Sequence, residues 1–259
     1  MGEFVRLEVE DEVGTIRLDR PKLNAISGQV ADELTQVARE AGDRDDIRAV
    51  VIWGGPKIFA AGADVAEMVD LTPDDVWPHI VRLQTALDLV EHLPRVTIAA
   101  INGYALGGGY ELALACDLRY AADNAKMGLP EIQLGIIPGA GGTQRLPQLI
   151  GVSRAKDIIF SGRQVRAEEA LQIGMADRVF PSRELYERTC EDALRFAKGP
   201  TKALEAAKRS IAEGLHTTRG EGQEIERRNF VQLFDTKDQK AGMRSLLEDG
   251  PGKAVFEGQ

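Results

Sequence analysis

The stretch GYALGGGYELALACD, residues 103–117, places three consecutive glycines directly before an acidic residue and a short apolar run. Glycine gives up more backbone entropy on folding than any other residue, so three of them in a structured segment need a physical reason. A flexible linker would explain residues 107–109 but not the apolar residues 112–115 that follow. We therefore interpret the glycines as a helix N-terminus that another group approaches closely, with Glu111 in the first turn.

The composition describes an ordinary globular protein: 259 residues, 43% apolar and 28% charged, enough for one large domain with or without an appendage. The net charge of −9 argues against a nucleic-acid partner and against an anionic membrane surface. Apolar stretches such as residues 49–53 are far shorter than the roughly 20 residues needed to span a bilayer. The acidic N-terminal segment and the two cysteines, Cys116 and Cys190, predict a cytoplasmic, metal-independent protein.

Strands alternate with helices along the first three quarters of the chain, which predicts a mostly parallel α/β sheet. Ser27 and Thr72 each precede a helical pattern as a capping residue, and Pro78 should kink the second helix or delay its start. After about residue 195 the strands stop, and two amphipathic helices should pack on the main domain or on a neighbouring subunit. The predicted strands are 4–9, 13–18, 49–53, 95–101 and 118–122, and the late helices are 200–213 and 221–248.

The sequence lacks the patterns of several common catalytic and binding sites. No G-x-G-x-x-G lies at a strand-to-helix turn, and residues 139–143 lack the lysine of a phosphate-binding loop. Residues 151–155 lack the final glycine of a nucleophile elbow. The three histidines, His79, His92 and His216, show no metal-ligand spacing. Nucleotide binding, triad hydrolysis and zinc chemistry are therefore disfavoured.

The glycines instead fit an oxyanion hole. The first N–H groups of a helix have no intrahelical partner and favour negative charge, and without Cβ atoms a ligand carbonyl can approach them. A second small-residue turn at residues 62–63 could supply another N–H, and each such donor is worth about 3–4 kcal/mol in acyl-transfer enzymes. Glu111 lies next to this turn, and Glu131 is the natural second carboxylate for acid–base work. Taken singly, each feature could equally serve tight packing or a helix dipole, but together they favour a catalytic site.

Six motifs agree with one family pattern: RPKLNA (20–25), KIFAAGAD (57–64), LPEI (129–132), GIIPGAGGTQRL (135–146), SGR (161–163) and GMADRV (174–179). Through them the sequence resembles the crotonase, or enoyl-CoA hydratase/isomerase, superfamily over nearly its whole length. The resemblance implies an α/β fold in which residues 1–195 form a spiral of β-β-α repeats that holds the acyl-CoA site. Residues 196–259 would form a C-terminal helical trimerisation region. The resemblance also implies an acyl-CoA thioester substrate, no separate cofactor because coenzyme A is part of the substrate, and a homotrimer or homohexamer.

The resemblance assigns roles to individual residues. Glu111 and Glu131 correspond to the two catalytic glutamates, which hold a water between them, Glu111 acting chiefly as base and Glu131 as the acid that protonates Cα. The backbone N–H groups of Ala63 and Gly108 would polarise the thioester carbonyl. The coenzyme A path would be formed by Ala61, Gly62, Ala63, Asp64 and Val65, with Lys22, Leu23 and Ala25 at the nucleotide end.

The two glutamates favour hydration of trans-2-enoyl-CoA to 3-hydroxyacyl-CoA, in fatty-acid or related acyl-CoA breakdown. An enoyl-CoA isomerase that relies mainly on Glu131, and a non-catalytic acyl-CoA-binding or interaction protein, stay open as alternatives. Two features depart from the family pattern. The tail at 246–253 is acidic and broken by glycine, with only Lys253 to approach the CoA phosphates. Tyr110 is bulky, and either packs in the core or trims the acyl pocket.

Overall fold

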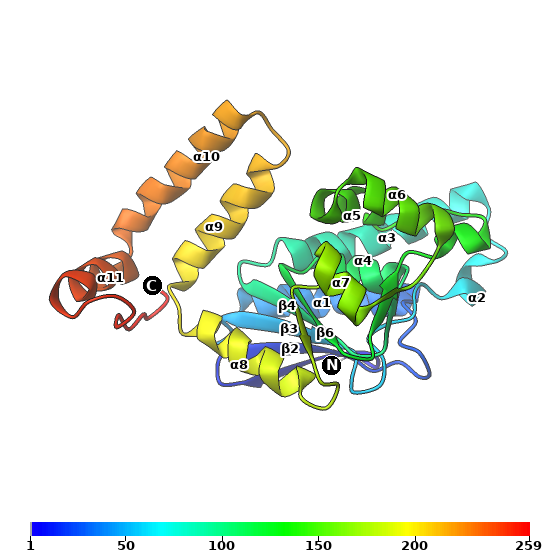
Figure 1. Ribbon diagram of the computed structural model, residues 1–259, viewed down its shortest axis with the longest axis horizontal. Coiled ribbons are helices and arrows are strands. Elements are labelled where there is room, and N and C mark those ends of the chain that lie inside the picture. The colour runs from blue at the N-terminus through cyan, green and yellow to red at the C-terminus, as the bar shows by residue number, and fades with distance from the viewer. Residues whose placement is uncertain (1) are drawn as a thin grey trace.

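The computed structural model describes residues 2–259, and its central element is a six-stranded sheet with the strand order β1-β2-β3-β4-β6-β9 (Figure 1). The first two strands are antiparallel and all other neighbours are parallel, as the sequence predicts. The strands of this sheet are β1 (Val5–Glu10), β2 (Val13–Leu18), β3 (Ala49–Trp53), β4 (Val96–Ile101), β6 (Leu118–Ala122) and β9 (Arg178–Phe180). A second sheet has the order β5-β7-β8, formed by β5 (Tyr104–Leu106), β7 (Lys126–Gly128) and β8 (Val165–Arg166).

Helices cover both faces of the large sheet, which explains why its central strands are continuous apolar runs. In β3, Val50 and Ile52 face the larger core, whereas Ala49 and Val51 face a smaller core beneath helix α8. The helices of the main body are α1 (Gly28–Asp43), α2 (Val65–Met68), α3 (Pro73–Glu91), α4 (Gly108–Leu114), α5 (Gly142–Ile150), α6 (Val152–Ser161), α7 (Ala167–Ile173) and α8 (Leu185–Ala197), with a 3-10 turn η1 (Glu131–Leu134).

Side-chain caps fix where the two long helices begin. The Ser27 hydroxyl accepts a hydrogen bond from the Val30 N–H at the start of α1. Thr72 and Asp75 form a reciprocal capping box at the start of α3. This box starts α3 at Pro73, and Pro78 lies inside the helix. Of the two effects predicted for Pro78, a delayed start is therefore wrong, and a kink stays a prediction.

Tyr110 belongs to the core and not to a substrate pocket. Its ring is fully buried, and its hydroxyl donates a hydrogen bond of 3.1 Å to the Met175 carbonyl oxygen. Of the two interpretations that the sequence left open for this residue, the structure favours core packing.

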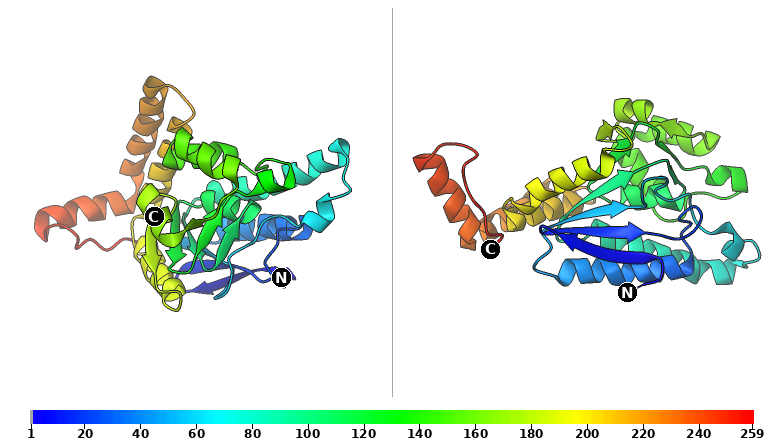
Figure 2. Two further views of the ribbon diagram at one scale, coloured as in Figure 1. Left: turned by 45° about the vertical axis from the view of Figure 1, so that its right-hand side comes forward. Right: turned by 90° about the horizontal axis from the view of Figure 1, so that it is seen from below.

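A helical arm follows the main body and extends away from the sheet in both views of Figure 2. We call residues 201–248 the C-terminal arm. The predicted single helix over 221–248 is wrong, because the backbone of Thr236 is extended and its hydroxyl caps a new helix by accepting from the Gln239 N–H. The arm consists of α9 (Thr201–Gly214), α10 (Arg219–Gln232), a 3-10 turn η2 (Leu233–Asp235) and α11 (Lys237–Glu248).

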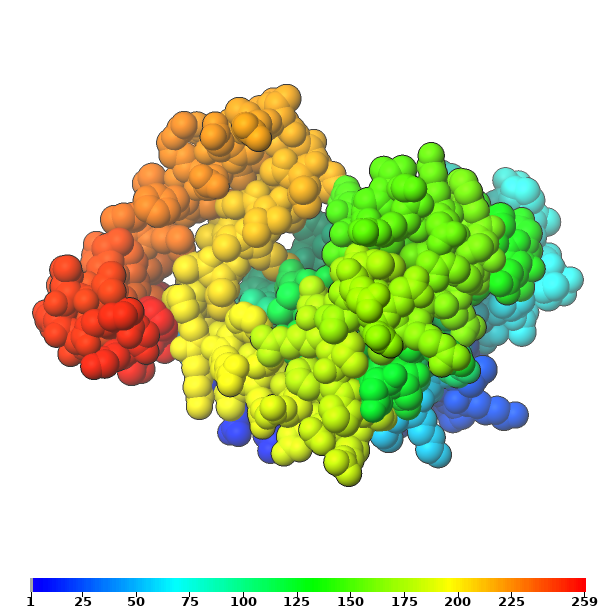
Figure 3. All heavy atoms as spheres, viewed as in Figure 1, coloured from blue at the N-terminus to red at the C-terminus, as the bar shows by residue number. Residues whose placement is uncertain are grey.

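The C-terminal arm contacts the main body and forms a separate lobe in the space-filling view (Figure 3). One of these contacts is the ion pair between Lys208 Nζ and Asp117 Oδ2, 2.9 Å apart. Apolar side chains such as Phe230, Val231 and Leu247 remain exposed on it. Exposed apolar surface of this kind marks interaction sites, and the homotrimer or homohexamer expected from the sequence stays a prediction. Within residues 2–259, no helix has both the length and the apolar character to cross a lipid bilayer.

Candidate active site

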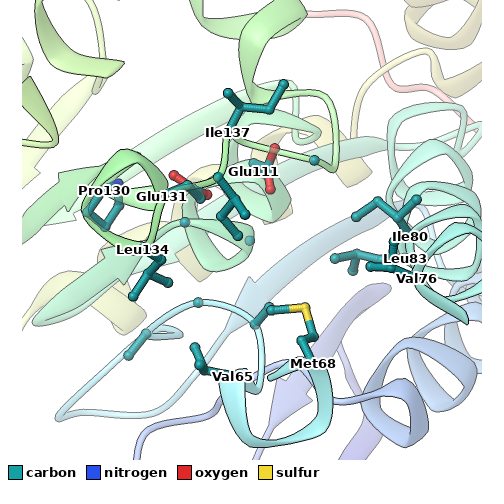
Figure 4. Close-up of a pocket in the computed structure, with 17 residues that line it drawn as sticks. Val65, Met68, Val76, Ile80, Leu83, Glu111, Pro130, Glu131, Leu134 and Ile137 are labelled. Carbon is teal, nitrogen blue, oxygen red and sulfur yellow. The ribbon is translucent and has the colours of Figure 1, made fainter. Parts of the chain in front are cut away.

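A cavity of about 310 Å³ lies at the N-terminus of α4, where the three glycines stand. Figure 4 shows its arrangement: Glu111 and Glu131 lie next to each other, and helix α3 lies at the side of the cavity that carries Val76, Ile80 and Leu83. The cavity brings together most of the residues that the sequence singled out. Those in its lining are Ala61, Gly62, Ala63, Val65, Gly108, Glu111 and Glu131.

The glycine turn places unpaired backbone donors at the cavity. Gly107 has φ +51°, a conformation that L side chains rarely adopt, and its N–H donates to the Gly128 carbonyl at 2.9 Å. Gly108 then opens α4, so its N–H lacks an intrahelical acceptor. A Cβ built on Gly108 would lie 3.6 Å from the Ala63 nitrogen, which shows how closely the two backbones approach.

Ala63 is held in place by its neighbours. The Ile26 N–H donates to the Gly62 carbonyl at 2.8 Å, and the Asp64 N–H donates to the Ile26 carbonyl at 3.0 Å. This pattern skips the Ala63 N–H. Within residues 2–259, neither the Ala63 N–H nor the Gly108 N–H donates to another group of the chain. The two donors therefore have the arrangement of an oxyanion hole.

Glu111 lies in the first turn of α4, and its side chain is almost fully buried. Its Oε1 accepts hydrogen bonds of 2.8 Å from the N–H groups of both Ala140 and Gly142, at the start of α5. Burial raises the pKa of Glu111, while these two N–H groups and the nearby charge of Arg145 oppose that rise. The other oxygen, Oε2, lies 3.9 Å from where a Cβ on Gly108 would stand, on the side of the oxyanion hole.

Glu131 is the first residue of η1, and it approaches the same point from a different part of the chain. Its Oε1 lies 3.0 Å from where a Cβ on Gly107 would stand, and its Oε2 is buried without a hydrogen-bond partner in the described part of the chain. Burial, and then the charge of Glu111, raise the pKa of Glu131 to about 7. The site thus pairs a hydrogen-bonded carboxyl with one whose pKa is raised toward neutral pH.

The walls away from the carboxyls are apolar, and the sequence analysis missed their role. Val76 and Ile80 belong to the same helical stripe as the buried Leu87 and Val90, and the apolar pattern alone does not distinguish cavity lining from core. The structure buries only the C-terminal part of that stripe and turns the N-terminal part toward the cavity. Further apolar residues of the lining are Met68, Leu83, Leu134, Ile136 and Ile137.

Asp64 does not line the cavity, although the sequence grouped it with the coenzyme A path. Its carboxylate accepts from Arg20 Nη2 at 2.6 Å and from the Ala66 N–H at 3.1 Å, so it caps α2. The carboxylate therefore fixes the segment that carries Ala63.

The other predicted nucleotide-end residues also lie outside the cavity lining. The Leu23 carbonyl accepts from the Ala61 N–H at 3.0 Å, and the Ala25 carbonyl accepts from Arg20 Nη1 at 3.1 Å. Lys22 and the Leu23 side chain are exposed beside this contact. The segment thus runs alongside the cavity-lining residues 61–63, and its part in holding coenzyme A stays a prediction.

Comparisons with known proteins identify the family and the fold of this chain. The family model described as enoyl-CoA hydratase/isomerase matches residues 8–259. A Bacillus subtilis (strain 168) protein that carries the name enoyl-CoA hydratase/isomerase is 41% identical over 261 residues, covering 100% of both chains. The solved enoyl-CoA hydratase of Bacillus anthracis is 37% identical with a TM-score of 0.93, covering 99% of this chain and 100% of its own. A Geobacillus kaustophilus structure of the same description is 34% identical with a TM-score of 0.96, covering 100% and 98%. These neighbours confirm the α/β spiral fold predicted from the sequence.

The raised pKa of Glu131 makes stability depend on pH. Between its ordinary value of 4.5 and about 7, the folded chain binds the proton that the unfolded chain has lost. This contribution to stability is therefore fully present below pH 4.5 and is lost as pH rises through 7. As the pH rises from 5 to 8, the free energy of unfolding should fall less for Glu131→Gln than for the wild type. Urea denaturation at each pH measures this difference.

Exposed Glu187 offers the control, because Glu187→Gln changes a carboxylate that makes no hydrogen bond in the described chain. It should keep the wild-type dependence on pH. Equal pH slopes for Glu131→Gln and the wild type would show that Glu131 titrates normally.

Proposed function

This chain belongs to the enoyl-CoA hydratase/isomerase family, and from that premise we propose that it hydrates trans-2-enoyl-CoA thioesters to 3-hydroxyacyl-CoA. The observation that carries the proposal is the meeting of Glu111 and Glu131 in one cavity beside two unpaired backbone N–H groups. The reaction would serve the breakdown of fatty acids or related acyl groups.

The proposed reaction begins with polarisation of the thioester. Its carbonyl oxygen accepts hydrogen bonds from the N–H groups of Ala63 and Gly108, which draws electron density from C3 of the conjugated enoyl group. Negative charge that develops on this oxygen meets donors that are already oriented. Such preorganised donors stabilise an enolate-like transition state without any further rearrangement.

The two carboxyls divide the proton transfers. Glu111 removes a proton from a water molecule as the water oxygen bonds to C3, and Glu131 delivers a proton to C2. One proton is taken up and one is given, so the reaction conserves the single proton that the pair holds. The N–H groups of Ala140 and Gly142 orient Glu111 and favour its carboxylate form. The pKa of about 7 suits Glu131 to proton donation near neutral pH.

Two observations favour hydration over the alternatives. An isomerase of this family would need mainly the Glu131-type residue, yet Glu111 is held in the cavity by two short hydrogen bonds. A protein that only bound acyl-CoA would gain nothing from a buried, unpaired carboxyl oxygen on Glu131, which costs desolvation free energy. The apolar walls fit the hydrocarbon part of an acyl group.

Hydration of crotonyl-CoA, followed as the loss of conjugated-enoyl absorbance, tests the proposal. The wild type should turn over, and both Glu111→Gln and Glu131→Gln should lose at least about 100-fold in kcat, the usual contribution of a positioned acid or base. Glu187→Gln should match the wild type.

Other results of the same assay contradict hydration. Wild-type activity in both glutamine variants would exclude the two-carboxyl mechanism. Faster movement of a double bond in a 3-enoyl-CoA than hydration of a 2-enoyl-CoA would identify an isomerase. Acyl-CoA binding without turnover would identify a binding protein.

Gly108→Ala separates catalysis from folding. The new methyl group would stand 3.6 Å from the Ala63 nitrogen and 3.8 Å from Leu83 Cδ2, ordinary contacts that the fold accommodates. It would also crowd the space beside the Ala63 N–H, through which the thioester oxygen of the proposed reaction would approach. We expect kcat/KM to fall about 100- to 1,000-fold, as when one oxyanion donor is lost, with an unchanged midpoint of thermal unfolding.

Gly109 provides the matched contrast, because a Cβ there would lie 2.2 Å from the Ala60 carbonyl oxygen. Gly109→Ala should therefore lower the unfolding midpoint. Full activity in Gly108→Ala would remove Gly108 from the oxyanion hole.

A further inference from the structure

Arg145 stands behind Glu111, outside the cavity lining, and connects two elements of the site. Building on the proposed function, we propose that Arg145 is a positioning residue, which fastens the turn that holds Glu111 to the helix that lines the acyl cavity.

The Arg145 side chain is only 14% exposed, and all three of its nitrogens are hydrogen-bonded. Nη1 donates to the Ala140 carbonyl oxygen at 2.9 Å. Nε and Nη2 donate to Glu91 Oε2 at 3.1 and 2.5 Å, and Nη2 also donates to Asp88 Oδ1 at 2.8 Å. The planar guanidinium thus joins the α5 turn to the C-terminal half of α3, a geometry that a lysine cannot reproduce.

On the catalytic side, Ala140 is held from both ends. Its N–H donates to Glu111 Oε1, while its carbonyl accepts from Arg145. The guanidinium also fills the space beside Gly141, where a Cβ would lie 2.1 Å from Arg145 Nη1 and where φ is +103°. The conformation that points the N–H groups of Ala140 and Gly142 at Glu111 is therefore built around Arg145.

On the acyl side, one face of α3 lies along the same turn. Ile80, Gln84, Asp88 and Glu91 follow each other at helical spacing. Gln84 Nε2 donates to the Gly139 carbonyl at 2.7 Å, and Ile80 packs so closely that a Cβ on Gly139 would lie 2.7 Å from its Cδ1. Ile80 also lines the cavity, so an acyl chain would touch a helix that is fastened to the turn behind Glu111 (Figure 4).

The chain offers a matched control in Arg163. This residue is likewise paired with two carboxylates, Asp157 at 2.8 Å and Glu169 at 2.8 Å, but it lines no part of the cavity. Arg163→Gln therefore removes a comparable pair of surface ion pairs without reaching Glu111.

The experiment compares wild type, Arg145→Gln, Arg145→Lys and Arg163→Gln. Hydrogen exchange of the segment 139–142, kcat and KM for crotonyl-CoA, and the pH profile of kcat/KM are measured. In Arg145→Gln we expect faster exchange at 139–142 and a kcat lower by about tenfold or more with KM changed less than about threefold, because misplacing one catalytic group costs turnover more than binding. The acidic limb should move to higher pH, since Arg145 favours the ionised form of Glu111.

Arg145→Lys keeps the positive charge but loses the planar guanidinium that bonds to several acceptors at once. The acidic limb of its kcat/KM profile should therefore match the wild type, whereas hydrogen exchange at 139–142 should stay as fast as in Arg145→Gln. If the wild type hydrates crotonyl-CoA and Arg145→Gln equals Arg163→Gln in exchange and kcat, the positioning role is overturned. A lower kcat with unchanged exchange and pH profile also overturns it. Faster hydrogen exchange at 139–142 in Arg145→Gln, together with a wild type that does not hydrate crotonyl-CoA, would support the positioning role and contradict the proposed function.

Discussion

The close approach of two backbones, residues 60–63 and the start of α4, is the constraint on which the site depends. A Cβ on Gly109 would lie 2.2 Å from the Ala60 carbonyl oxygen, and Gly107 requires a positive φ to turn the chain into the helix. Only glycine meets both demands. The result is a helix N-terminus at the cavity, where the unpaired N–H of Gly108 lies near the unpaired N–H of Ala63.

The carboxyl pair follows from the same geometry. Glu111 lies in the first turn of α4, and every residue of this helix is buried. A buried carboxylate needs hydrogen-bond donors to remain charged. The N–H groups of Ala140 and Gly142 supply them. Glu131 receives no such donors for its Oε2 and lies near the charge of Glu111, so its pKa rises to about 7. Two identical side chains thus acquire different proton affinities from their surroundings.

The sequence predicted the parts of the structure that local patterns encode. The strands from β1 to β4 and β6, the caps at Ser27 and Thr72, and the convergence of Glu111 and Glu131 on the glycine turn all appear as expected. Strands β5, β7, β8 and β9 span only two or three residues each, too few for a periodic pattern, and depend on pairing with distant segments. The family resemblance places Asp64, the last residue of the motif at 57–64, on the coenzyme A path, but it does not reveal that the carboxylate caps α2, a contact that depends on the local backbone turn. The contacts of Arg145 with α3 were not predicted, although the residue lies within the motif at 135–146, because its carboxylate partners are 54 and 57 residues away in the chain.

The pH profile of kcat/KM for hydration tests the carboxyl pair most directly. Hydration uses the singly protonated pair, with the proton on Glu131 and the charge on Glu111. We expect a bell-shaped profile with an alkaline limb near the pKa of about 7 of Glu131. An activity that stays constant from pH 5 to pH 9 would contradict this account.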